Sequence, residues 1–531
     1  MRASIRFVVL LAALAGLFAL AGVANAQKPG GTLRIQLMDT PPSPSIHEEA
    51  TVTVAVPFMA LYNNLVVYDQ AIARNTFESI RPDLATSWST SPDGKKLTFK
   101  LRPGVKWHDG KPFTAEDVRC TFEALLGTSE PKIRRNPRGA WYTNVEKVTA
   151  DAALEATFHL KAPQVSLVAL LASGYSPIYP CHVSLTDMRR HPIGTGPFKF
   201  VELKNNVGVK LIKNTEYWKP GRPYLDAIEY TILPDRATRM LAFTAGRFDM
   251  TFPADVTVPL LKNIRKEAPH AQCTLRPSGV SANLIINRDL PPFDNPLVRK
   301  ALALTLDRKA FSDILSEGHD PIGGTMLPPP EGVWGLSAAD LKDMPGYGDV
   351  DASREQARAL MRQVGYGPDK KLKIKVSTRN IASFKDPAVI LIDQLRHVYV
   401  EAELEIIDTA AYYSRMFKKD YVVGLNLTGS AVDDPDQHFF ENYACGSPRN
   451  YNNYCSPEVT AMMNAQSSEP DQNKRRKMVA DIERKLADDV ARPIILHGVA
   501  AGCWQPHVKG LTLMVNSIYN GWRFEDIWLD K

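Results

Sequence analysis

The cysteines are the residues of this sequence whose chemistry can be interpreted first from type and spacing. Cys445 and Cys455 stand ten positions apart in CGSPRNYNNYC, a segment with Gly, Ser, Pro and Asn that can close on itself easily. The six cysteines are an even number, and disulfides persist in exported proteins, a location that the N-terminal segment indicates below. We therefore predict a Cys445–Cys455 disulfide. The pairing of the others stays open: Cys120, Cys181, Cys273 and Cys503.

Zinc and calcium are the alternatives for the polar residues near this segment. His438 lies close to Cys445 in the sequence, but the chain contains no C-x-x-C pair of the kind that zinc sites use. Asp433, Asp434 and Asp436 form an acidic cluster, but an EF-hand loop also needs a central Gly and a Glu at its twelfth position. We predict no metal site and keep calcium as a secondary alternative.

Catalytic motifs are missing where the common enzyme classes need them. The sequence has no G-x-S-x-G elbow, and His47-Glu48-Glu49 lacks the second histidine of H-E-x-x-H. Gly194-Thr195-Gly196 is followed by Pro197, so it does not make a G-x-G-x-x-G loop, and no G-x-x-x-x-G-K-[ST] occurs. Spacing alone does not place two carboxylates about 5 to 9 Å apart, as a glycosidase needs. We predict a protein that is not an enzyme and has no cofactor.

Composition describes a globular protein of ordinary charge. The chain has 531 residues, too many for one compact core, so two or three domains are expected. Hydrophobic residues make up 44% and charged residues 23%, which argues against disorder and coiled coil. The 64 Lys and Arg against 58 Asp and Glu give a net charge of +6. That excess is too small to indicate nucleic-acid binding.

The N-terminal segment, residues 1–26, reads as a secretory signal peptide. Arg2 and Arg6 precede an apolar stretch, and Ala24-Asn25-Ala26 forms a small-x-small cleavage pattern. A retained membrane anchor is the alternative, but it needs about 20 apolar residues. Removal of the segment leaves a net charge of +4. The first cysteine is Cys120, so we expect no lipid anchor and a soluble protein outside the cytoplasm.

Hydrophobic periodicity predicts an α/β protein. The turn at 91–94 predicts a hairpin, and Thr114 with Asp117 forms a capping box before a helix. Strands are expected over 30–37, 154–160, 198–203, 207–212, 371–377 and 403–407. Helices are expected over 52–68, 163–172, 234–246, 298–316, 353–364, 387–398 and 467–487.

Several segments in this order resemble the family 5 extracellular solute-binding proteins of the peptide, nickel and opine type. The most specific block is LRPGVKWHDG at 101–110 followed by TAEDV at 114–118. The likeness covers essentially the whole chain after residue 26. The further matching segments are YNNLVVY at 62–68, PDLATSW at 82–88, SPDG at 91–94, GTGPF at 194–198, NTEYW at 214–218, FDNPLVR at 293–299 and DPD at 434–436.

The resemblance implies a two-lobed periplasmic-binding-protein fold of type II, in its large three-domain form, with hinge closure around a ligand. Such a protein delivers its ligand to an ABC permease that cytoplasmic ATPases drive, and we expect a monomer. The motifs quoted above are then scaffold turns. By the family pattern domain I comprises 27–70, 191–290 and 500–531, domain II comprises 71–190, and domain III comprises 291–499. A receptor that serves chemosensing, or a secreted hydrolase on the same fold, is an alternative function.

The resemblance also suggests which residues hold the ligand. In peptide-binding members an Asp four residues before the Pro of the D-P-D-like motif binds the peptide amine. Counting back from Pro435 gives Ala431, so the chain departs from the family at this position. Asp433, with Asp434 beside it, is the possible substitute. Peptide specificity is therefore in question.

Two arginines match the family positions that bind carboxylates. Arg379 falls at a position where dipeptide-binding members look to have an Arg that pairs with the ligand carboxylate. A guanidinium fits a carboxylate in bidentate geometry. Arg138 with Trp141 resembles an Arg-x-x-Trp element that binds and stacks on the chelator in nickel-chelate members. These residues predict an anionic ligand, such as a metal chelate or an opine. The alternative is a short peptide whose amine is bound by Asp433. The corresponding structural interpretations are a surface salt bridge for Arg379, and a core position for Trp141 with a solvated Arg138.

Overall fold

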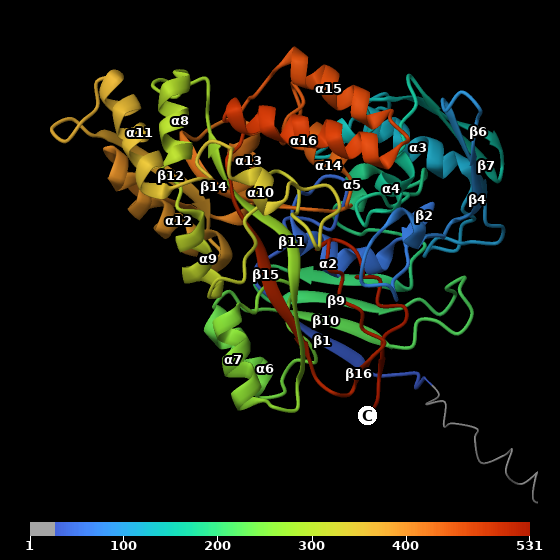
Figure 1. Ribbon diagram of the computed structural model, residues 1–531. Helices are drawn as coiled ribbons and strands as arrows, with labels where there is room; N and C mark the ends of the chain where they lie inside the picture. Colours follow the sequence, from blue (N-terminus) through green and yellow to red (C-terminus); the bar gives the residue numbers. More distant parts are fainter. Residues whose placement is uncertain (1–26) are drawn as a thin grey trace, which may run out of the picture.

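The computed structural model describes residues 27–531. The predicted signal peptide, residues 1–26, lies outside the described residues. Helices cover three larger sheets, which confirms the predicted α/β class (Figure 1). No helix within residues 27–531 is long and apolar enough to cross a membrane.

The first sheet has four strands in the order β1-β10-β9-β8. β1 runs parallel to β10, and the other neighbours are antiparallel. Alternation of apolar residues places Leu33 and Ile35 of β1 in the core, as the early-strand prediction requires. The bounds are β1 Thr32–Leu37, β8 Phe198–Lys204, β9 Gly208–Lys213 and β10 Ala227–Ile232.

The second sheet is antiparallel with the strand order β4-β5-β7-β6, and helix α3 covers it. One continuous apolar core, with residues such as Leu33 and Phe99, joins this sheet to the first, and we call the two together the first lobe. The bounds are β4 Ala85–Thr90, β5 Lys96–Leu101, β6 Val145–Ala152, β7 Glu155–Leu160, α3 Ala115–Leu126, α4 Leu167–Ala172 and α5 Leu185–Met188. Smaller elements complete the lobe: α2 Val52–Phe58, β2 Val66–Tyr68, β3 Ile80–Pro82, α6 Arg236–Thr244, α7 Val258–Glu267, β16 Val508–Lys509 and β17 Trp528–Leu529.

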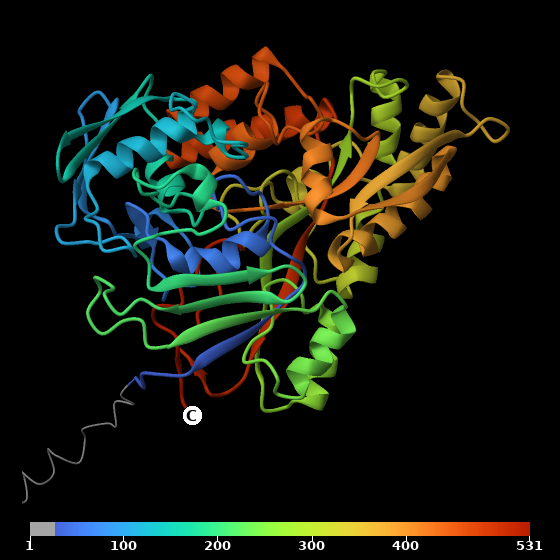
Figure 2. The same ribbon diagram turned by 180° about the vertical axis from the view of Figure 1, so that it is seen from behind.

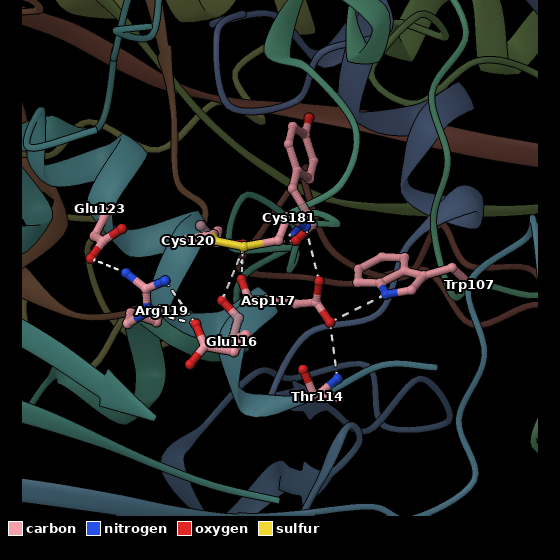
Figure 3. Close-up of a disulfide and its surroundings, with 10 residues drawn as sticks. Trp107, Thr114, Glu116, Asp117, Arg119, Cys120, Glu123 and Cys181 are labelled. Atoms are coloured by element: carbon pink, nitrogen blue, oxygen red, sulfur yellow. Dashed lines mark hydrogen bonds and ion pairs between the residues drawn. A yellow bond between two sulfur atoms is a disulfide. The ribbon is translucent and has the colours of Figure 1, made fainter. Parts of the chain in front are cut away.

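The motif block at 101–118 is held together by the carboxylate of Asp117 (Figure 3). Its Oδ2 accepts the indole N–H of Trp107 at 3.3 Å and the backbone N–H of Thr114 at 2.9 Å, which completes the predicted capping box. Its Oδ1 accepts the backbone N–H of Cys181 at 2.9 Å, next to the Cys120–Cys181 disulfide. These contacts all lie within the first lobe, so the block acts as scaffold.

The third sheet has the order β13-β12-β14-β11-β15 and carries the second lobe, which we define as this sheet with helices α8 to α16. β12 is parallel to β13 and β14, whereas β11 is antiparallel to β14 and β15. The strands are β11 Gln272–Ile286, β12 Leu372–Arg379, β13 Val400–Ile407, β14 Val423–Gly429 and β15 Ile494–Trp504. The helices are α8 Pro296–Leu304, α9 Arg308–Ser316, α10 Ala338–Leu341, α11 Val350–Gln363, α12 Ala382–Leu395, α13 Thr409–Phe417, α14 Pro435–Asn442, α15 Pro457–Ser467 and α16 Gln472–Asp488.

The long strands β11 and β15 run from one lobe into the other (Figure 2). Near Cys273 they pack with α6 and α7, whereas near Leu284 they belong to the core of the second lobe. Their register breaks between Pro277 and Val280, where Gly279 has a φ of +66° that a side chain would strain. We call this break the hinge step.

Several predicted elements differ in extent from the observed ones. The expected helix over 52–68 ends at Phe58, and the chain reaches β2 after a 3-10 turn. The expected helix over 298–316 is two helices, because the side chain of Asp307 caps a new N-terminus. The helix expected over 467–487 begins at Gln472, since Asp471 caps it and Ser467 ends α15.

Disulfide pairing follows the prediction where one was made. Cys445 and Cys455 are bonded. The other pairs are Cys120–Cys181 and Cys273–Cys503, so no described cysteine is free. His438, the possible zinc ligand, instead lies 2.8 Å from the hydroxyl of Ser430.

Candidate functional site

A cavity of about 600 Å³ lies between the lobes, against the hinge step of β11 and β15. The first lobe contributes residues before α2 and around α7, and the second lobe contributes residues from α9, α12 and the end of β12. Most of the wall is apolar, with Met38, Val52, Phe384, Leu427 and Ile518 as examples. A cavity of this size and position fits a small organic molecule.

The charged residues of the cavity wall are mostly neutralised by ion pairs. Arg236 of α6 lies 3.1 Å from Asp386 of α12, a pair that joins the two lobes. Arg379 pairs with Asp39 of the first lobe at 3.4 Å. Asp320 lines the cavity as well, and burial raises its pKa to about 6. Its Oδ1 accepts the backbone N–H of Val499 at 2.7 Å.

Arg379, the predicted carboxylate ligand, stands at the end of β12 and lines the cavity. Its Nε donates to Thr409 at 2.7 Å, and Nη1 donates to Thr51 at 3.2 Å and to the hydroxyl of Tyr413 at 3.4 Å. Its Nη2 faces Asp39, whose carboxylate also accepts the hydroxyl of Thr409. The guanidinium is thus already occupied by contacts that cross between the lobes.

Arg138 is not part of the cavity wall and packs against Tyr175. Its guanidinium carbon is 3.1 Å from the ring centre of Tyr175, and that ring lies 4.6 Å from the ring of Tyr519, which lines the cavity. Nη1 donates to the carbonyl of Glu49 at 2.8 Å, but Nε and Nη2 are buried without a partner within residues 27–531. Burial lowers the pKa of Arg138, because no adjacent carboxylate outweighs the loss of water.

Trp141, three residues after Arg138, connects the two lobes. Its indole N–H donates to Glu441 of α14 at 2.9 Å, and both side chains are almost fully buried. Glu441 also pairs with Arg449. Burial opposes the charge of Arg449, but the Glu441 carboxylate outweighs this effect and raises its pKa. Arg138 and Trp141 therefore come from one short segment, with Arg138 directed to the tyrosines and Trp141 to the second lobe.

Ala431, which the motif count places at the family's amine-binding position, offers no charge. Its side chain is buried, and its backbone N–H donates to Gln437 at 2.7 Å. Its carbonyl accepts the amide of Asn520 at 2.8 Å and the hydroxyl of Ser517 at 3.3 Å. The backbone at this position is therefore also engaged.

The acidic cluster after Ala431 is tied to residues outside the cavity wall. Asp433 accepts the amide of Asn516 at 3.3 Å, and burial raises its pKa to about 6, with the charge of Asp434 adding to the shift. Asp434 caps α14 and forms a bidentate pair with Arg475, with both N–O distances 2.7 Å. Neither acid is part of the cavity wall. Their ligand roles stay predictions.

The sequence did not point to Asp39, Asp320, Tyr175 or Tyr519. A signal existed for Asp39, because a polar residue just past the end of a predicted strand, here two residues after Leu37, lies where ligands meet α/β sheets. Tyr175 and Tyr519 stand in segments without regular structure, where periodicity carries no information. Asp320 follows α9 in an irregular segment, and only the fold brings it to Val499.

Two α/β lobes that share long strands and enclose a cavity define a class of ligand-binding proteins that close around a small molecule. The family model for bacterial extracellular solute-binding proteins, family 5 Middle, matches residues 79–450, and the chain belongs to this family. The resemblance drawn from the motifs is thereby confirmed.

Relatives with known names match along most of the chain. The probable di/tripeptide-binding protein 5 of Pseudomonas aeruginosa is 24% identical over 485 residues, which cover 85% of this chain and 87% of that protein. Heme-binding protein A of Haemophilus influenzae is 26% identical over 482 residues, covering 85% and 84%. The names of these two relatives give different ligands, a di- or tripeptide and heme.

Solved structures share the fold. The periplasmic binding protein DppA of Helicobacter pylori, in complex with the peptide STSA, has a TM-score of 0.84 at 22% identity, covering 96% of this chain and 100% of that one. AgaA of A. tumefaciens R10, in complex with agropinic acid, has a TM-score of 0.82 at 22% identity, covering 94% and 99%. The predicted two-lobed periplasmic-binding-protein fold is confirmed.

Proposed function

We propose that this protein is the periplasmic substrate-binding component of an ABC importer and that it captures a small carboxylate-bearing ligand between its lobes. The observation that carries the choice of ligand is the guanidinium of Arg138. Family membership and the fold support the transport role. Small peptides, opines and metal chelates all carry carboxylates, so the proposal names the charge and leaves the compound to experiment.

The argument for the carboxylate rests on the cost of a buried charge. An arginine that is 3% exposed and has no ion-pair partner within residues 27–531 loses its hydration, and the Glu49 carbonyl and the Tyr175 ring compensate only part of that loss. A ligand carboxylate that accepts from Nε and Nη2 would supply the missing partner in the geometry that a guanidinium favours. The nearby pair of Arg449 and Glu441 is already balanced.

Arg379 then serves closure of the lobes in this proposal. Its bonds to Asp39 and Thr51 reach the first lobe, so they form only when the lobes meet. Trp141 acts in the same way through Glu441. We expect Arg379→Ala to cost about 2 kcal/mol or more in ligand affinity, and the loss would be shared by charged and uncharged ligands.

The remaining parts of the proposal follow the family pattern. Domain I comprises 27–70, 191–290 and 500–531, domain II comprises 71–190, and domain III comprises 291–499. The protein acts as a monomer without a lipid anchor, after removal of residues 1–26, and docks on a membrane permease. It binds its ligand without chemical change, so a ligand recovered intact would support a receptor and argue against a hydrolase.

Native mass spectrometry of the purified protein, before and after denaturing extraction, tests the proposal. A single carboxylate compound or chelate should be recovered, and Arg138→Gln should weaken its binding by 30-fold or more, since loss of a buried charge pair costs about 2 to 5 kcal/mol. Arg299→Gln is the matched control, because Arg299 also donates from Nη1 to backbone carbonyls and has an unpartnered Nε, away from the cavity. Equal affinity for Arg138→Gln and the wild type would contradict the proposal.

A short peptide is the second candidate, favoured by the names of several relatives, including the di/tripeptide-binding protein. Recovery of a mixture of di- to pentapeptides whose binding depends on Asp433 would select it. Asp433 would then bind the amine, and Asp433→Ala should abolish peptide binding. Retained peptide affinity in that variant would remove Asp433 from the site.

A further inference from the structure

Asp320 is the charged residue of the cavity wall that the fold leaves unbalanced. The three other charged side chains of the wall in residues 27–531 each have an ion-pair partner: Arg236, Arg379 and Asp386. Asp320 has no such partner among the described residues, although its side chain is mostly buried. When Asp39, the partner of Arg379, is counted with the wall, Asp320 leaves one negative charge without an opposite charge beside it.

Asp320 lies beside the hinge step of β11 and β15. Its Oδ1 accepts the backbone N–H of Val499, which faces Pro277 in the β11–β15 register, at the hinge step. Around it the wall is apolar, with Leu315 and Leu496 among its members. A carboxylate in such surroundings gains more from a cation than one in water does.

We infer that Asp320 binds a cationic group of the ligand, a primary ammonium, and so replaces the acid that is missing at Ala431. The inference rests on the proposed function and deepens it: the ligand then carries an ammonium at Asp320 as well as a carboxylate at Arg138. The apolar part of the cavity wall beside Asp320 accommodates the body of the ligand, and the carboxylate must reach past Tyr519 and Tyr175 to Arg138. Asp320 becomes a specificity residue that separates amine-bearing ligands from amine-free ones.

The raised pKa of Asp320, about 6, supplies an independent readout. An ammonium beside it lowers that pKa, so binding of an amine near pH 6 releases a proton. The other titratable groups nearby are His319, which is adjacent in sequence, and His497 on β15. Burial lowers the pKa of His497 to about 4, so it stays neutral in this range. Glu317 at the end of α9 pairs with Lys262 of α7.

Two probes that differ only in the ammonium group test the inference. These are 2-aminooctanoyl-leucine and octanoyl-leucine, which share the carboxylate and the apolar skeleton. At pH 7.5 calorimetry should give an affinity for the amine at least tenfold higher than for the amine-free probe. Asp320→Asn should remove this advantage, since it keeps an oxygen for Val499 and loses the charge. Asp386→Asn, the matched control, alters an acid that Arg236 already neutralises and should keep the advantage.

Proton release provides the second measurement. Titrations at pH 6 in buffers of different ionisation enthalpy should show proton release for 2-aminooctanoyl-leucine in the wild type and none in Asp320→Asn. Equal affinity for the two probes, an advantage that survives Asp320→Asn, or no binding of either probe to folded protein would each overturn the inference. Failure of the proposed carboxylate site can be told apart from failure of the Asp320 inference. If Arg138 does not bind the carboxylate, Arg138→Gln should leave the affinity for octanoyl-leucine unchanged.

Discussion

The hydrogen bond from Trp141 to Glu441 joins the two lobes and can be removed by one substitution, Trp141→Phe. The indole N–H lies 2.9 Å from Oε2 of Glu441, and both residues are almost fully buried. A hydrogen bond to a charged acceptor contributes about 1.5 to 3 kcal/mol. Because this bond spans the lobes, its loss falls on the closed state, and the apparent dissociation constant should rise by about 10- to 100-fold.

Trp107→Phe is a matched control for this substitution. Trp107 is also a buried tryptophan whose indole N–H donates to a carboxylate, that of Asp117 at 3.3 Å, but donor and acceptor belong to one lobe (Figure 3). Its loss should lower the melting temperature in the open and closed forms alike. Ligand affinity should therefore stay within about twofold of wild type.

Calorimetry with 2-aminooctanoyl-leucine, together with thermal unfolding of the ligand-free protein, separates the two effects. Small-angle scattering at saturating probe should show a larger closed fraction for Trp107→Phe than for Trp141→Phe. If both variants lose affinity to the same degree, or if Trp141→Phe binds as tightly as wild type, the interlobe role of this hydrogen bond is wrong.

Three further sets of substitutions should each change the free energy of unfolding in a different way. Asp320→Asn should stabilise the ligand-free protein above pH 6 by up to about 3 kcal/mol in chemical unfolding. The reason is that the pKa of Asp320 is raised in the folded state, so the stability of the wild type declines as the pH rises from about 4 to 6. A wild-type pH profile without that decline would contradict this. Arg475→Met should cost about 3 to 5 kcal/mol in the same assay, since it leaves the buried Asp436 without its ion-pair partner, and a loss below 1 kcal/mol would refute the account. Replacement of Cys445 and Cys455 by Ser should cost about 2 to 3 kcal/mol without altering affinity, as measured by unfolding and calorimetry, and a large change in affinity would place the loop at the site.

Local signals in the sequence predicted much of the scaffold. The capping box at Thr114 and the closely spaced Cys445 and Cys455 each depend on residues near one another in the chain, so spacing was sufficient. The break between α8 and α9 was missed because a buried apolar pattern continues across it and only Asp307 marks the new N-terminus.

The candidate site was less accessible to prediction from sequence. Motif positions pointed to both Arg138 and Arg379. The structure shows that Arg379 has an ion-pair partner in Asp39, which is distant in sequence, whereas two nitrogens of Arg138 have no partner among the described residues. The charge balance of the cavity, which singles out Asp320, can be assessed only when the partners of each charge are known. Long-range pairing of this kind leaves no periodic pattern in a single sequence.

The disulfide between Cys273 and Cys503 fixes the two crossing strands to each other at directly paired positions, at their first-lobe end. With this link in place β11 cannot slide along β15, so the pair behaves as one ribbon that can flex at the irregular step between Pro277 and Val280. In the closure that we propose, this ribbon would guide the lobes along one path of approach. Every closed molecule would present the same pair of faces to a permease, whereas the reduced chain, before its cysteines are joined, would lack this guidance.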